Sequence, residues 1–120
     1  MLYQVRLELA REAGHPDGDS RIGYDAVLPL NLEGKLDAEA WHRERRRCRV
    51  RHFGPDQSER VGRLARRPGG AWYFDYEPGE ADDERGFRLD RETFILGEYV
   101  SVEDSNGRMH TYRICRVDPV

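Results

Sequence analysis

The residues with the most evident chemistry lie in the stretch WHRERRRCRVRHF, residues 41–53, where six of thirteen side chains are arginine. Guanidinium groups bind carboxylates and phosphates through pairs of parallel hydrogen bonds. Between residues 41 and 67 the chain has ten arginines and only three carboxylates. This segment therefore predicts a surface for an anionic partner, and Trp41 and Phe53 could add stacking contacts to nucleic-acid bases.

The same segment also has a purely structural interpretation. Residues 72–104 hold eleven carboxylates and three arginines, so neighbouring strands could neutralise the positive charge internally, with Arg63 and Arg66 near Asp75 and Glu77. Arginines at the end of a helix also complement the helix dipole without any ligand. Both interpretations stay open at the level of sequence.

The overall charge favours one kind of partner over another. The chain has a formal net charge of −3, whereas nucleic-acid-binding domains are usually basic. We therefore expect a non-catalytic module that binds a protein partner, with single-stranded nucleic acid as the alternative and self-association between oppositely charged faces as a further outcome. The candidate binding residues for either partner are Arg45, Arg46, Arg47, Arg49, Arg51, Trp41 and Phe53.

Metal binding and catalysis have weaker support. Cys48 and His52 fall on one face of a predicted strand but about 13 Å apart, too far to share one ion. The acidic loop at residues 80–84 lacks the spacing of a calcium loop. No P-loop, dinucleotide-binding glycine pattern or nucleophile elbow occurs. We expect no metal or cofactor and assign no catalytic residue; an enzyme of unidentified type using His52 or His110 is the second alternative.

The first half of the chain predicts two strands and a helix that position the arginines. Apolar and polar residues alternate over residues 2–10, the period of a strand buried on one face. Residues 23–31 predict a second strand, in which Pro29 indicates an edge position or a strand end. Asp37 is the expected N-cap of a helix over about 37–47, whose packing face consists of Leu36, Ala40 and Trp41.

The second half predicts further short strands. Residues 48–53 continue from the helix as a strand, and residues 58–67 and 71–77 form a hairpin around the turn RPGG. A brief strand is expected at 86–89. In the second strand of the hairpin, alternation directs three aromatic side chains into the core: Trp72, Phe74 and Tyr76.

The carboxy-terminal section contains the clearest turn, because Asn-Gly is a strong hairpin signal. A three-residue loop at 105–107 sets Val102 opposite His110 and Val100 opposite Tyr112. A two-residue loop would shift this register by one residue and reverse the faces. We expect the three-residue loop.

Length and composition predict one domain, residues 1–120. Leu, Ile, Val and Phe make up only about a fifth of the residues, so the twelve aromatic side chains must supply much of the core. The predicted fold is mainly β: a small antiparallel barrel or strongly bent sheet of about seven short strands with one short helix. No apolar run approaches the ~20 residues of a membrane span, so we expect a cytoplasmic protein with Cys48 and Cys115 as free thiols.

Three segments, RRPGGAWYFDYE, DDERGFRL and FILGEYVSVEDSNGRMHTYRICRV, give the chain a resemblance to a known group of sequences. It resembles a family of short uncharacterised proteobacterial proteins, and the likeness covers most of the chain. The resemblance implies a bacterial origin and a self-contained domain. It brings no activity, cofactor or site residues.

Overall fold

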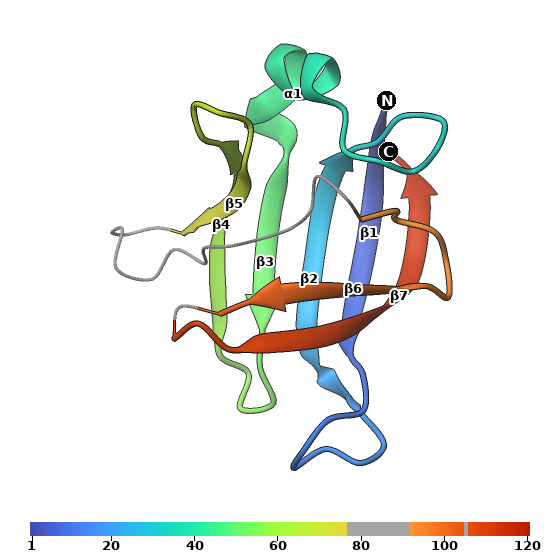
Figure 1. Cartoon of the computed structure of the whole chain (residues 1–120), viewed down its shortest axis with the longest axis vertical. Helices are drawn as coiled ribbons and strands as arrows, with labels where there is room; N and C mark the ends of the chain where they lie inside the picture. The colour runs from blue at the N-terminus through green and yellow to red at the C-terminus, as the bar shows by residue number, and fades with distance from the viewer. Residues whose placement is uncertain (77–91, 105) are drawn as a thin grey trace.

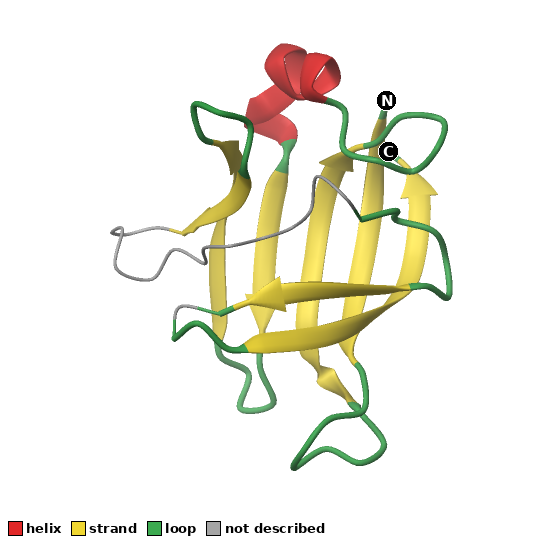
Figure 2. Ribbon diagram, viewed as in Figure 1, coloured by secondary structure: helices red, strands yellow, loops and turns green. Residues whose placement is uncertain are grey.

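The computed structural model describes residues 1–76, 92–104 and 106–120. These residues form one seven-stranded antiparallel sheet with the order β5-β4-β3-β2-β1-β7-β6, curled into a half-barrel (Figure 1, Figure 2). The strands are β1 (Leu2–Leu9), β2 (Asp19–Pro29), β3 (Arg49–Phe53), β4 (Glu59–Arg66), β5 (Trp72–Tyr76), β6 (Tyr99–Glu103) and β7 (Met109–Pro119). The predicted mainly β architecture with one short helix is confirmed.

The strand β7 pairs with its two neighbours along different parts of its length. Its first half pairs with β6 and its second half with β1, so the β6–β7 hairpin crosses in front of the sheet (Figure 1). A register shift in the pairing with β1 omits Cys115, and such bulges increase local twist. The predicted hairpin register is confirmed, with Val100 opposite Tyr112 and Val102 opposite His110.

The core fills the inside of the curl with alternate residues of every strand. The ring of Tyr24 on β2 lies 5.4 Å from Phe74 on β5 and 5.0 Å from Tyr112 on β7, centroid to centroid. Trp72, Phe74 and Tyr76 are all buried, as predicted. The aromatic side chains therefore join the two sides of the half-barrel across its interior.

The helix α1 (Ala38–Glu44) covers one open end of the half-barrel (Figure 1). The carboxylate of Asp37 accepts hydrogen bonds from the backbone N–H groups of Glu39 and Ala40 at 3.0 and 3.3 Å, so the predicted N-cap is confirmed. The last turn tightens into a 3-10 helix, η1 (Arg45–Arg47). Within the described ranges, no helix has both the length and the apolar character needed to cross a membrane.

Two details of the predicted strands differ from the structure. Pro29 ends β2, but β2 lies between β1 and β3, so the edge-strand alternative was wrong. The strand also begins at Asp19, because a bulge between β1 and β2 lets pairing continue past the turn-forming residues. A Cβ at Gly23 would lie 1.9 Å from the carbonyl oxygen of Leu7, so only glycine permits this approach of β2 to β1.

The strand predicted at 86–89 and the acidic loop at 80–84 lie outside the described residues.

Candidate anion-binding surface

The arginine-rich residues 43–51 span the end of the helix and the start of β3, and the two faces of β3 differ in burial. Val50 is buried in the core, so period-two alternation places Arg49 and Arg51 on the outer face of β3. The three arginines of η1 are exposed above it. The structure thus exposes the predicted arginines of η1 and places Arg49 and Arg51 on the outer face of β3.

Some of these arginines already have carboxylate partners. Arg47 donates to Glu44 at 2.7 Å, and Arg51 donates to Glu59 at 3.1 Å and also to Asp25. Asp25 accepts a second ion pair from Arg6 at 3.0 Å. The hydrogen bond with Asp25 is the largest cause of the raised pKa of Arg51. Arg47 and Arg51 are therefore part of the folded protein's own ion-pair network.

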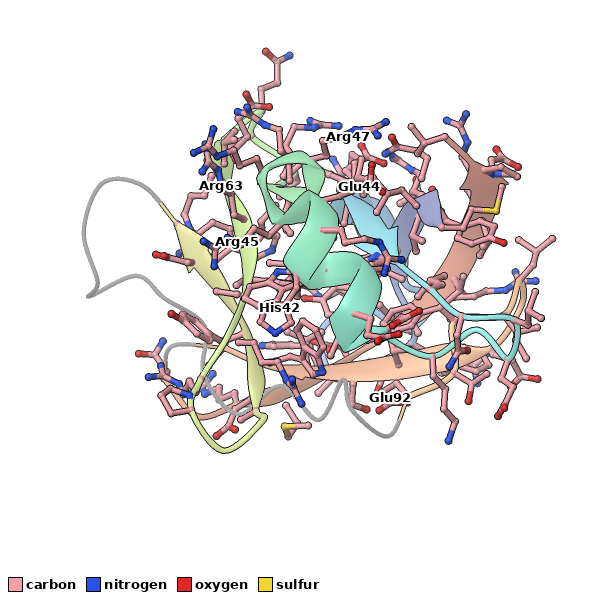
Figure 3. The ribbon with its side chains drawn as sticks, turned by 90° about the horizontal axis from the view of Figure 1, so that it is seen from above. His42, Glu44, Arg45, Arg47, Arg63 and Glu92 are labelled. Atoms are coloured by element: carbon pink, nitrogen blue, oxygen red, sulfur yellow. The ribbon has the colours of Figure 1, made fainter. Side chains whose placement is uncertain are left out.

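Four other arginines of this region differ from Arg47 and Arg51. Arg45, Arg46, Arg49 and Arg63 form no ion pair with any residue that the structure describes. We call these four residues the arginine surface. Figure 3 shows Arg45 and Arg63 on the same side of α1. Arg49 and Arg63 lie directly opposite each other on β3 and β4, and like charges in that position repel. The pairing of β3 with β4 therefore places two positively charged side chains next to each other on the outer face of the sheet.

The expected neutralisation by residues 72–104 is only partly visible. Asp75 is the cross-strand neighbour of Arg63, as predicted, but the two side chains form no ion pair. Arg66 lies opposite Trp72 rather than a carboxylate. Glu77 lies outside the described residues. Within the described part of the chain, the carboxylates that pair with Arg47 and Arg51 come from β2, α1 and the start of β4.

The two aromatic residues proposed for base stacking are otherwise engaged. Trp41 is 8 % exposed, and its Nε1–H donates to the carbonyl oxygen of Leu64 at 3.0 Å. Its ring meets Trp72 edge to face at 5.7 Å. Phe53 is half-buried and has the guanidinium carbons of two arginines, Arg6 and Arg51, at 4.5 and 5.1 Å from its ring centre. Neither ring offers a vacant platform for a base.

His110 is held between two carboxylates, which bears on the catalytic alternative. Its Nδ1 lies 3.1 Å from Glu12 and its Nε2 lies 2.9 Å from Asp104. Burial lowers the pKa of His110, but the hydrogen bonds with Asp104 and Glu12 outweigh burial and leave the pKa raised. A histidine with both nitrogens bonded to carboxylates acts as a structural cation more readily than as a base. His52 stacks on Tyr24, with ring centroids 4.2 Å apart.

The cysteines have little nucleophilic character. Cys48 is buried, and burial raises the pKa of its thiol to about 11. Cys115 is exposed, yet partial burial of its thiol and the nearby Glu8 raise its pKa as well. In the described part of the chain, no group of three or more His, Cys, Asp or Glu side chains could hold a metal ion. The described residues therefore support charge recognition better than catalysis.

Sequence reasoning treated Arg63 only as a residue to be neutralised, and its place beside Arg49 follows from the pairing of β3 with β4. The hairpin turn at residues 54–58 was the signal that could have set this register. Comparison with known proteins adds no further residue: no protein-family model, no curated protein and no solved structure matches the chain significantly. The resemblance to a proteobacterial family stays a prediction.

Proposed function

We propose that the protein is a non-catalytic binding module that engages an acidic segment of a protein partner through the arginine surface. One observation carries the proposal. Arg45, Arg46, Arg49 and Arg63 form no ion pair with a described residue, whereas the adjacent Arg47 and Arg51 are paired. Arginine is enriched at protein interfaces because its planar fork binds carboxylates bidentately at low desolvation cost.

The same observations support an acidic peptide over nucleic acid. Trp41 is buried and Phe53 is in contact with guanidinium groups, so stacking would require both rings to move. The net charge of −3 also works against the long phosphate backbone of nucleic acid. A short acidic segment needs only the local positive charge. We keep nucleic acid as an outcome of the test.

The expected energy is modest and measurable. An exposed ion pair contributes about 0.2–1 kcal/mol, so three lost pairs amount to about 0.6–3 kcal/mol, or about a 3- to 150-fold change in affinity. The attraction should weaken with added salt, because exposed charges are screened over about 10 Å at 0.1 M ionic strength. Exposed charges at the edge of an interface strongly affect the rate at which the two partners associate.

The test is fluorescence anisotropy with three labelled probes: a Glu/Asp-rich peptide, its Gln/Asn counterpart and a single-stranded oligonucleotide. The arginine-surface variant is Arg45→Gln/Arg46→Gln/Arg49→Gln. The matched control removes the same charge from three other exposed arginines, Arg11, Arg108 and Arg113, which form no ion pair with the described residues. Sedimentation of each variant tests for a change in self-association relative to the wild type, and circular dichroism tests whether each variant is folded.

The proposal expects salt-sensitive binding of the acidic peptide that the arginine-surface variant loses and the control keeps. Equal losses in both variants would mean that only net charge matters. Tighter binding of the oligonucleotide, lost in the same variant, would replace the protein partner by nucleic acid. No binding of any probe at low salt would leave the surface without a ligand and reject the proposal.

A further inference from the structure

A second feature lies beside the arginine surface, where α1 and η1 approach the turn between β4 and β5. A hollow of about 530 Å³ opens there, and Figure 3 shows His42 and Arg45 on this side of the helix. Among the residues that the structure describes, no carboxylate lines it. The described lining includes Trp41, His42, Arg45, Arg66, Arg67 and Gly70.

Each arginine of the hollow rests on an aromatic ring. A cation–π contact engages the face of a guanidinium group and leaves its N–H donors, which lie in the plane, available to a ligand. It also restricts the rotamers of a long side chain, so less entropy is lost on binding. The three contacts, measured from the guanidinium carbon to the ring centre, are Arg45 on Trp41 at 5.8 Å, Arg66 on Trp72 at 5.3 Å and Arg67 on Tyr73 at 4.3 Å.

The glycine-rich turn fixes one of these arginines. Arg66 donates from Nε to the carbonyl oxygen of Gly70 at 3.4 Å. Gly70 has a φ of 98°, and a Cβ at this position would lie 3.2 Å from Nη2 of Arg66. A side chain here would strain the turn and press on the guanidinium group. Arg45 and Arg67 form no ion pair with described residues.

We propose that this hollow binds the phosphoryl group of a phosphorylated side chain in the acidic segment. The inference rests on the proposed function and deepens it. A carboxylate offers one negative charge to three guanidinium groups, whereas a phosphoryl group offers a charge of about −1.5 to −2 and three acceptor oxygens. Three arginines with no carboxylate among the described residues of the hollow match the phosphoryl group better.

The chain has a built-in reporter for this site. Its only two tryptophans, Trp41 and Trp72, both contact arginines of the hollow. Intrinsic fluorescence should therefore respond when inorganic phosphate enters, at a constant ionic strength kept with chloride. Sulfate serves as the second anion. A phosphoserine peptide, its unphosphorylated form and its glutamate form then separate a phosphorylated side chain from free phosphate and from a carboxylate.

The variant Arg67→Gln tests the hollow, and Arg67→Lys keeps the charge without the planar fork. Arg49→Gln is the matched control, because Arg49 belongs to the arginine surface but does not line the hollow. Wild-type protein should bind the phosphoserine peptide at least about tenfold more tightly than the unphosphorylated peptide. Arg67→Gln should bring this ratio close to one. Arg49→Gln should weaken both peptides and preserve the ratio.

The two proposals fail in different ways. A ratio near one in the wild type, or a ratio that Arg67→Gln leaves intact, overturns the phosphoryl site even if acidic peptides bind. A ratio lost in Arg67→Gln, combined with no effect of the arginine-surface variant on acidic peptides, supports the hollow and rejects the broader surface. Unlabelled oligonucleotide and unlabelled phosphoserine peptide can each compete with the labelled phosphoserine peptide. If the oligonucleotide displaces it at the lower concentration, the assignment to a protein ligand is overturned.

Discussion

The pairing of His110 with two carboxylates makes a prediction about stability and pH. His110 is the second residue of β7, Glu12 follows β1, and Asp104 follows β6, so this cluster ties the tip of the β6–β7 hairpin to the β1–β2 connection. His110→Gln keeps similar bulk but removes the positive charge. Two hydrogen bonds between charged groups, discounted because the His110 side chain is 27 % exposed, contribute about 1–2 kcal/mol together.

The direction of the pH dependence follows from the two pKa shifts. The pKa of His110 is raised from 6.5, so its contribution is complete below about pH 6.5 and is lost as pH rises through the raised value. Burial raises the pKa of Asp104, but hydrogen bonds from His110 and from the backbone N–H groups of Arg108 and Asn106 outweigh it and lower the pKa below 3.8. Its contribution is lost as pH falls through that lowered value. The cluster therefore stabilises the fold most between about pH 4 and 6.5.

Urea denaturation of the wild type and His110→Gln at pH values from about 5.5 to 9 measures the effect. The difference in the free energy of unfolding should be about 1–2 kcal/mol near pH 5.5 and should shrink steadily toward about pH 9. His42→Gln is the control, because His42 is exposed and forms no ion pair with described residues. A difference for His110→Gln that stays constant with pH would refute the charged cluster, since a merely steric role does not titrate.

Three further predictions concern the scaffold. Gly62→Ala should cost about 1–3 kcal/mol or more, because a Cβ at Gly62 would lie 2.1 Å from the carbonyl oxygen of Asp75; an unchanged urea midpoint would contradict the close approach of β4 and β5. Asp37→Ala should cost about 1 kcal/mol through loss of the helix cap, while Asp37→Asn should cost much less; equal melting temperatures for both variants would argue against capping. Cys48 should resist a thiol reagent in the native protein and react only after unfolding, leaving one thiol titrated under native conditions; fast reaction of two thiols would show that Cys48 is accessible.

Much of the fold was predictable because its signals are local. Period-two alternation identified β1 and β5, a carboxylate before a helical run identified the cap at Asp37, and Asn-Gly set the register of the last hairpin. Each of these features depends on residues within about one turn or one strand of each other. Strand order depends on pairings between distant segments, so the interior place of β2 and the double pairing of β7 could not be read from Pro29 or from Cys115.

The candidate site also combines features that local sequence predicts with features that depend on distant segments. The alternation over residues 48–53 is enough to place Arg49 and Arg51 on one face of the strand, and the structure agrees. Whether either arginine has a partner depends on the neighbours β2 and β4: Asp25 and Glu59 reach Arg51, while Arg49 meets Arg63 instead. Composition alone cannot distinguish these outcomes. The burial of Trp41 likewise depends on how α1 covers the half-barrel.

The most direct test of the central claim compares arginines that pair with a described carboxylate and arginines that form no ion pair with a described residue. Two double variants each remove two positive charges: Arg49→Gln/Arg63→Gln and Arg47→Gln/Arg51→Gln. The affinity of each variant for the acidic peptide is measured in the same anisotropy assay at low salt. The account predicts that the first variant weakens binding about 2- to 30-fold, while the second changes affinity little and instead lowers stability. Equal loss of affinity in both variants, or greater loss in the second, would contradict it.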